Sequence, residues 1–201
     1  MNFLEFTNAF GSSPVIDIRN VLTYFNGLDR RRLYEWQKKG YLIKLASNFY
    51  LLAGKPVNDD VLREAACCIY HPAYVGLESA LAYYNLIPEA VFQTVGVTPR
   101  RAKTISSPAG DFRFRSIKTA LFFGYNAVDA GNSRFFISDP EKTVLDALYF
   151  REGSDKKETL QAMRLNLSEL RQRLDPGKLI TYLRLFASPK LDKAAQLLLE
   201  M

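Results

Sequence analysis

The sequence has little of the chemistry on which most catalytic and metal sites depend. Its 201 residues include one histidine, one tryptophan and two cysteines. A serine triad or a zinc site needs several side chains of this kind, and here the partners are missing. Glycine loops that bind phosphate are missing too, in both common patterns. The sequence therefore predicts no catalytic residue, no metal site and no cofactor.

Two further absences bear on where the chain works. No apolar run comes near the roughly 18 residues that a membrane helix needs, so we expect no membrane partner. The N-terminus, MNFLEFTNAF, has neither a basic leader nor an apolar stretch before a small-residue cleavage site. A secretory signal is therefore not expected, and the predicted location is the cytoplasm.

The scarce residues have structural interpretations. Cys67 and Cys68 are adjacent in VLREAACCIY, where helical spacing points them in different directions. A disulfide between them would be awkward, so we expect two reduced thiols in the core. The single histidine, His71, stands between Tyr70 and Pro72 in a turn-like context that favours a structural role.

Charged residues are plentiful but unevenly placed. The formal net charge is +6. Residues 1–56 carry eight Lys/Arg against four Asp/Glu, residues 57–153 carry ten against eleven, and residues 154–201 carry nine against six. The two ends are basic and the middle is not. Such a surplus permits a polyanionic partner without identifying one.

Residues 1–56 predict a helix, a short strand, two more helices and a hairpin. Residues 14–16 are short and extended, and the Asn-Gly pair at 26–27 is expected to end the second helix. Asp29 can cap a third helix over DRRRLYEWQKKG, which would bury Leu33 and Trp36. The apolar positions that mark the first two helices are Phe3, Leu4, Phe6, Phe10, Ile18, Val21, Leu22 and Phe25.

The segment after the third helix, YLIKLASNFYLLAG, predicts the hairpin. It consists of two apolar, β-rich runs around a turn at residues 46–48. Two helices separated by a short turn are typical of a helix-turn-helix, and a hairpin directly after them is typical of its winged form. The hairpin is the predicted wing.

Residues 57–201 predict a mixed region followed by a helical tail. The polar segment GKPVNDD is the expected linker. Helices are expected at 61–70, at 77–86 and from Asp139, where a capping aspartate precedes a proline. Strands are expected for VFQTVGV, AKTIS, DFRFRSI, ALFFGY and RFFIS. In the tail, helices are expected to start at 175–176 and 188–189, with packing positions at Leu179, Ile180, Leu183, Phe186, Leu197 and Leu198.

The predicted fold class is therefore α+β, with three parts. Residues 1–56 form a winged helix-turn-helix that binds DNA, and residues 57–153 form a mixed α+β domain. Residues 154–201 form a helical C-terminal segment packed on the second domain. The sequence leaves open whether the protein is a monomer or a dimer.

The third helix carries the strongest signal for DNA binding. In a helix-turn-helix the second helix lies in the major groove with its N-terminal residues at base edges. Arginine there can donate two hydrogen bonds to guanine, while lysines and hydroxyls hold phosphates. Arg32 is expected toward the flank of the helix. The predicted DNA-binding residues are Arg30, Arg31, Arg32, Tyr34, Lys38, Lys39, Lys44 and Asn48.

A second group of basic residues follows in the middle of the chain. In FRFRSI the alternation of a strand puts Phe112 and Phe114 on one sheet face and two arginines on the other. The group could extend the DNA footprint, meet an acidic partner, or form an ordinary solvated sheet face, and charge alone cannot choose. Its members are Arg100, Arg101, Lys103, Arg113, Arg115 and Lys118.

One short motif points weakly to an enzyme. Residues 139–142, DPEK, are similar to the acidic and lysine residues of metal-dependent nucleases. In those enzymes the carboxylates converge on a metal from strands, whereas here they open a predicted helix. A nucleic-acid-processing enzyme is therefore kept only as an alternative.

Several blocks of the sequence, in order, resemble a known family. These blocks are PAYVGLESALAYYNLIPE, TVGVTPRRAK, DFRFRSIK and FFISDPEKTVLDALYF. Over about residues 10–152 the chain resembles the AbiEi-type antitoxins and the transcriptional regulators related to them. It departs from them in the wing, where relatives tend to have a basic residue and a glycine and this chain has Ser47 and Asn48. Asparagine can adopt the left-handed turn conformation, so the hairpin is still expected.

The resemblance implies a function and a partner. It implies a winged helix that binds the protein's own promoter in double-stranded DNA, followed by an antitoxin domain. The functional partner would be a toxin of the nucleotidyltransferase class, countered without a stable protein–protein complex. The DNA-reading role would fall on residues 29–39 and 41–52. The alternative is a regulator without a toxin partner, whose second domain senses a ligand through the polar sheet face.

Overall fold

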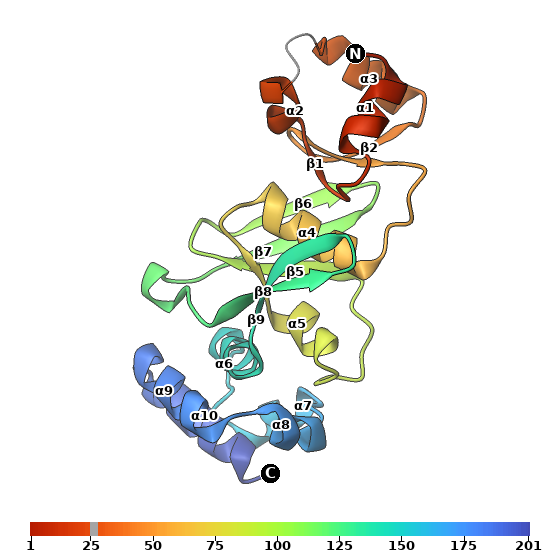
Figure 1. Cartoon of the computed structure of the whole chain (residues 1–201). Helices are drawn as coiled ribbons and strands as arrows, with labels where there is room; N and C mark the ends of the chain where they lie inside the picture. The colour runs from red at the N-terminus through yellow and green to blue at the C-terminus, as the bar shows by residue number, and fades with distance from the viewer. Residues whose placement is uncertain (25–27) are drawn as a thin grey trace.

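The computed structural model describes residues 1–24 and 28–201, and its fold is α+β with two sheets among these residues (Figure 1). The helices and strands up to residue 52 follow the predicted order. The predicted helix end at 26–27 and the packing position Phe25 lie outside the described residues. The elements are α1 (Phe3–Phe10), β1 (Ile16–Asp17), α2 (Ile18–Tyr24), α3 (Arg30–Lys38), β2 (Leu42–Ala46) and β3 (Phe49–Leu52).

Local sequence signals account for the ends of these elements. The Asp29 side chain caps α3 by accepting a hydrogen bond from the Arg31 backbone N–H at 2.9 Å. Gly40 follows α3 with φ +72°, a conformation that glycine adopts without strain. Asn48 takes φ +68° in the β2–β3 turn, as predicted. Leu4, a predicted packing residue of α1, is 68% exposed, so that prediction was wrong.

The first sheet has the strand order β1-β3-β2, with both pairs antiparallel. Its central strand β3 is buried on both faces. Tyr50 and Leu52 pack with Leu33 and Trp36 in the core formed by α1, α2 and α3. The other side of the hairpin packs on α4 and the second sheet through Val15, Leu45, Phe49 and Leu51. The hairpin therefore lies between the first helices and the rest of the molecule (Figure 1).

The second sheet has the order β6-β7-β5-β4-β9-β8 within the described residues. β5 runs parallel to β7, and β4 runs parallel to β9. One face is covered by α4, while α5 and α6 lie on the other. The elements are α4 (Asp59–Ile69), β4 (Tyr74–Val75), α5 (Leu77–Tyr83), β5 (Gln93–Thr98), β6 (Lys103–Ser107), β7 (Gly110–Ser116), β8 (Tyr125–Ala130), β9 (Ser133–Ser138) and α6 (Pro140–Phe150).

The structure corrects one predicted strand and adds two. The segment ALFFGY is not a strand, because it contains a 3₁₀ helix, η1 (Thr119–Leu121), and only its last residue belongs to β8. Its apolar side chains turn into the core instead of alternating: Leu121 is buried, and the Phe122 ring lies 5.2 Å from that of Tyr74. The short β4 and the polar β8 were not predicted, since neither shows an apolar alternation of useful length.

The C-terminal helices pack on α6 around the buried residues Leu179, Phe186 and Leu198. Ile180, a predicted packing residue, is 51% exposed, so that prediction was wrong. Within the described residues no helix combines the length and the apolar character needed to cross a membrane. The helices are α7 (Lys157–Ala162), α8 (Leu167–Arg173), α9 (Pro176–Phe186) and α10 (Pro189–Leu199), the last two beginning at the predicted prolines.

Candidate nucleic-acid interface

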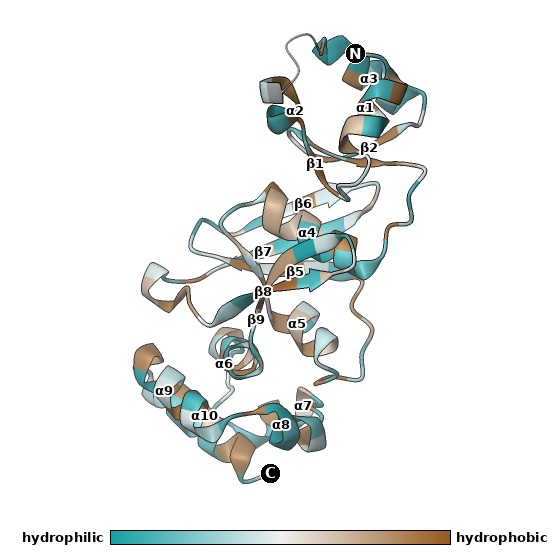
Figure 2. Ribbon diagram, in the orientation of Figure 1, coloured by the Kyte–Doolittle hydropathy of each residue, from teal (hydrophilic) through white to brown (hydrophobic). Residues whose placement is uncertain are grey.

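The outer face of α3 presents four of the eight predicted DNA-binding side chains to solvent. Leu33 and Trp36 hold the helix on the core, and the opposite face carries Arg31, Tyr34 and Lys38 at the helical spacing of three and four residues. Tyr34 is 68% exposed. The α3 ribbon is mostly hydrophilic in colour (Figure 2). We call the exposed side chains of Arg30, Arg31, Tyr34 and Lys38 the α3 face.

The cations of the α3 face are not paired with carboxylates in the described residues. None of its cations forms an ion pair with a carboxylate within residues 1–24 and 28–201. Glu35 is exposed on the same helix without such a pair. Unpaired surface cations attract polyanions over a range of about 10 Å at 0.1 M salt. The face can therefore hold phosphates or base edges without first breaking an internal ion pair.

Two other predicted cations of this region lie at its margins. The Arg32 guanidinium donates a hydrogen bond to the Met1 carbonyl oxygen at 2.8 Å, which agrees with its predicted place on the flank. Lys39 is exposed as the C-cap residue of α3. Arg32 is thus partly committed to the fold, whereas Lys39 is free to contact a phosphate beside the α3 face.

Lys44 lies on the hairpin next to the start of α3. It is the cross-strand partner of Tyr50, so both side chains lie on the same face of the sheet. Burial raises the pKa of Tyr50, and the positive charge of Arg30 opposes that increase. Arg30 and Lys44 therefore flank the same tyrosine, and the structure brings Lys44 close to the α3 face.

Asn48 is held by the fold. Its backbone carbonyl oxygen accepts a hydrogen bond from the Ile18 N–H at 2.8 Å, which ties the β2–β3 turn to the start of α2. Its neighbour Phe49 packs toward α4 and lies 5.2 Å below the Arg19 guanidinium. The hairpin is a packing layer between two parts of the molecule, and its contact with DNA through Asn48 stays a prediction.

The second basic group does not form a single patch. Arg100 lies 4.2 Å from the centre of the Tyr70 ring, and Lys103 lies 5.4 Å from it, on the face of the sheet that α4 covers. Arg113 and Arg115 lie on the opposite face, because β7 alternates and its Phe114 is the partner of Lys103. The prediction of one cluster is therefore corrected to two groups on opposite faces. Arg101 and Lys118 are exposed in the loops that bound β6 and β7.

The structure also reveals a charged cluster that the sequence did not single out. Lys142 and Asp146 form an ion pair one helical turn apart in α6, and neither side chain is exposed. The Tyr74 hydroxyl donates a hydrogen bond to Asp146 at 2.6 Å and accepts one from Lys142 at 3.0 Å. Burial lowers the pKa of Lys142 and raises the pKa of Asp146, while their mutual attraction opposes both shifts. The sequence does show a lysine and an aspartate four residues apart, a spacing that allows an ion pair on a helix. It does not show that both side chains are buried.

A second part of this cluster joins α6 to α9. Lys178 lies 3.0 Å from carboxylate oxygens of both Asp139 and Glu141. Glu141 also accepts a hydrogen bond from the Asp175 N–H at 2.7 Å, and Asp139 accepts one from the Tyr182 hydroxyl at 2.8 Å. Burial lowers the pKa of Lys178, but its bonds to the two carboxylates outweigh this and raise it overall. All the charged residues of DPEK are thus engaged in holding the fold.

The remaining reactive side chains lack the features of activated groups. Cys67 and Cys68 are free thiols, as predicted, with Cys67 buried and Cys68 half-buried. Burial raises the pKa of each to about 12, so neither forms an appreciable amount of thiolate at neutral pH. Among residues 1–24 and 28–201 there is no group of three or more His, Cys, Asp or Glu side chains that could hold a metal ion.

Comparison with models of protein families gives no match for the chain, and comparison with curated proteins gives no significantly similar sequence. The resemblance to the AbiEi-type antitoxins therefore stays a prediction. What bears on function is the arrangement of side chains, and above all the unpaired basic face of α3.

Proposed function

We propose that this protein is a DNA-binding transcriptional regulator whose residues 1–56 form a winged helix-turn-helix. The observation that carries the proposal is the α3 face, which presents an exposed tyrosine and three cations that form no ion pair within the described residues. The other exposed side chains of this helix are Arg32 and Glu35. In this motif such a helix enters the major groove and places its first turns at base edges.

The topology of the first region supports the proposal. A helix, a strand, two helices and a hairpin follow one another, and β1 joins the far side of the hairpin to give the order β1-β3-β2. The three-stranded sheet lies on one side of this core, and the outer face of α3 is exposed to solvent on the other side. The short turn between β2 and β3, tied to Ile18, makes this wing a support for α3 more than a projecting arm.

We assign roles to the side chains by their place on the helix. Arg30 and Arg31, in the first turn, are proposed to read bases, because guanidinium groups can donate two parallel hydrogen bonds to guanine. Lys38 and Lys44 are proposed to hold phosphates on either side. Arg32, bound to the Met1 carbonyl, is proposed to orient the N-terminus and to contribute less to DNA binding.

The resemblance extends the proposal to an antitoxin. In this reading the protein represses its own operon and counteracts a nucleotidyltransferase-class toxin without a stable complex. The test is co-expression with any neighbouring gene of that class. Growth should be restored by the wild-type chain and also by Arg31→Ala, because α3 would serve repression and not neutralisation. A neighbouring gene that is not toxic would contradict the antitoxin part alone.

The direct test of DNA binding is titration of the purified protein with its own upstream region and with a scrambled duplex, at several salt concentrations. Counterion release predicts a log–log slope of about −0.9 for each phosphate contacted. Tight, salt-sensitive binding that prefers the upstream region would support the proposal. Equal or undetectable binding to the two duplexes would contradict the role of α3 as a sequence reader.

A further inference from the structure

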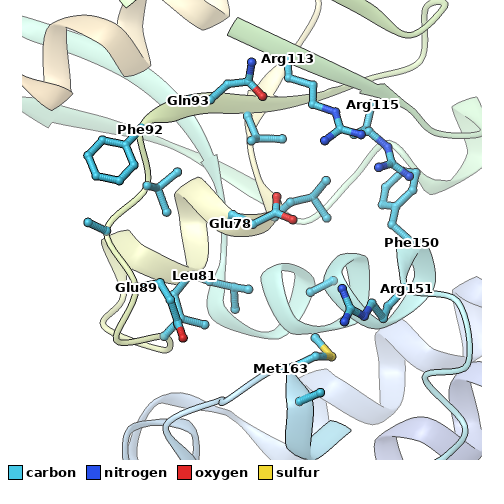
Figure 3. Close-up of a pocket in the computed structure, with 17 residues that line it drawn as sticks. Glu78, Leu81, Glu89, Phe92, Gln93, Arg113, Arg115, Phe150, Arg151 and Met163 are labelled. Atoms are coloured by element: carbon cyan, nitrogen blue, oxygen red, sulfur yellow. The ribbon is translucent and has the colours of Figure 1, made fainter. Parts of the chain in front are cut away.

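A cavity of about 670 Å³ lies between the second sheet and the helices below it (Figure 3). Its roof is formed by the outward face of β7 and β5, one wall by α5, and its floor by the end of α6 and by α7. Cavities that bind small ligands commonly measure about 300–1,000 Å³. This cavity therefore has room for a small molecule, and it is far from the α3 face (Figure 1).

Three arginines reach this cavity from two elements. Arg113 and Arg115 descend from β7, and Arg151 comes from the end of α6 (Figure 3). None of them forms an ion pair with a carboxylate of the described residues. The Arg115 guanidinium lies 4.8 Å from the centre of the Phe150 ring, which fixes its orientation. The roof thus offers two neighbouring guanidinium groups that form no ion pair within the described residues.

The acidic side chains near the cavity do not neutralise it. Glu89 is bound to Arg164 at 3.0 Å. Glu78 projects from α5 into the middle of the cavity and forms no ion pair within the described residues (Figure 3). Glu152 and Glu158 line an adjoining hollow beside Arg115 and Arg151. The strongest net positive charge therefore lies on the Arg113 side of the roof.

Apart from Gln93, the rest of the lining is apolar, and its rim carries an exposed aromatic side chain. Leu81, Val95 and Met163 face the cavity from three different elements. Phe92 stands at the mouth with 95% of its surface exposed. An exposed aromatic ring beside a cavity provides a flat surface on which a planar group can stack. The cavity is thus polar at one end and apolar at the other.

We propose that this cavity binds a free mononucleotide. Its phosphate would lie between Arg113 and Arg115, whose guanidinium groups match phosphate in geometry and charge. The Glu78 carboxylate in the middle would accept hydrogen bonds from sugar hydroxyls. The base would lie over the apolar wall and against Phe92. The floor formed by α6 and α7 closes the cavity below, which favours one nucleotide over a continuing strand. The proposal does not depend on DNA binding by α3.

The test is isothermal titration of the full chain with the four ribonucleoside monophosphates, the corresponding nucleosides and inorganic phosphate. At least one monophosphate should bind more tightly than both its nucleoside and phosphate. Arg113→Gln should weaken it about 10–100-fold, the effect expected for a lost charge-assisted hydrogen bond. Arg113 is exposed, so the thermal unfolding of this variant should match that of the wild type.

The matched control is Lys103→Gln, which removes one positive charge from the neighbouring strand on the opposite face of the sheet. It should leave nucleotide affinity unchanged, as should Arg31→Ala in α3. The proposal is overturned if no monophosphate binds more tightly than inorganic phosphate, or if Lys103→Gln weakens binding as much as Arg113→Gln. It is also overturned if only an oligonucleotide binds. DNA binding by the wild type, measured separately, is unaffected by any of these outcomes.

Discussion

Helices α3 and α6 begin in the same way but differ in whether their charged side chains are exposed or buried. Each starts at a capping aspartate, Asp29 or Asp139, and each carries several charged residues in its first turns. In α3 the cations point to solvent and form no ion pairs in the part of the chain that the structure describes, whereas in α6 Lys142 is buried against Asp146. The difference lies in the surroundings: α3 packs through one face, while α6 is enclosed by α5, α9 and α10.

The comparison shows what a run of charges can and cannot indicate. Charges on a helix with one packed face remain available to a partner. Charges on an enclosed helix must be paired, because an unpaired buried ion loses several kcal/mol of hydration. The buried pair is weak evidence for added stability but strong evidence that its two members depend on each other. Both statements can be tested by substitution.

The largest expected effect comes from breaking the buried pair. Lys142→Met leaves Asp146 without its cation in a site that no solvent reaches, so the free energy of unfolding should fall by about 3–5 kcal/mol. Urea unfolding followed by circular dichroism measures this. The double variant Lys142→Met/Asp146→Leu should recover much of the loss, since no uncompensated charge remains. A double variant no more stable than the single one would show that the cost is steric.

Much of the fold follows from the sequence where helix caps and apolar spacing agree. Asp29, Asp139 and the prolines of α9 and α10 start helices as predicted, and Leu33 and Trp36 are buried as predicted. The failures occur where long-range packing overrides local pattern. ALFFGY has the composition of a strand, yet its aromatic rings find partners in the core and its backbone turns.

The candidate sites also differ in how far the sequence alone could predict them. The α3 face could be predicted because it depends on one helix and its period. The buried cluster and the cavity could not be predicted, because both depend on the order of strands and the packing of helices. These bring Tyr74 into hydrogen-bond contact with Asp146, and they place Arg113 and Arg151 in the lining of the same cavity. Strand alternation correctly put Phe114 and Arg113 on opposite faces. The pairing of Lys103 with Phe114 across β6 and β7, which the sequence alone does not show, places Lys103 on the Phe114 face of the sheet and not on the Arg113 face.

The next largest effect is expected for the exposed cations of α3. Arg31→Ala should weaken binding to the upstream duplex by about 1–3 kcal/mol and to a scrambled duplex much less, if it reads a base. Lys38→Ala should weaken both alike and reduce the salt slope by about one phosphate contact. Fluorescence anisotropy on the two duplexes separates these outcomes. Equal losses on both duplexes for Arg31→Ala would remove its role as a base reader.

A smaller effect is expected where a cation is only half enclosed. Lys178 is 38% exposed and bridges Asp139 and Glu141. Lys178→Met should lower the free energy of unfolding by about 1–2 kcal/mol, less than at Lys142, because both buried carboxylates keep another hydrogen-bond donor, the Tyr182 hydroxyl for Asp139 and the Asp175 N–H for Glu141. Hydrogen exchange of the α9 amides should accelerate. The control is Lys190→Met, because in the described residues the Lys190 ammonium forms no ion pair and donates a hydrogen bond to the exposed Arg151 carbonyl oxygen at 3.2 Å, so its loss should have little effect.

The smallest expected effect is on the stability of the α3 variants themselves. Arg31 is near the positive end of the helix dipole, so Arg31→Ala should leave the free energy of unfolding unchanged or raise it by a few tenths of a kcal/mol. Lys38 is near the negative end, and Lys38→Ala should lower it by a similar amount. Chemical unfolding of both variants beside Lys142→Met checks this order. A loss of stability above about 1 kcal/mol in Arg31→Ala would mean that the Arg31 side chain supports the fold. The contrast between the exposed charges of α3 and the buried charges of α6 would then not hold at Arg31, where base reading is proposed.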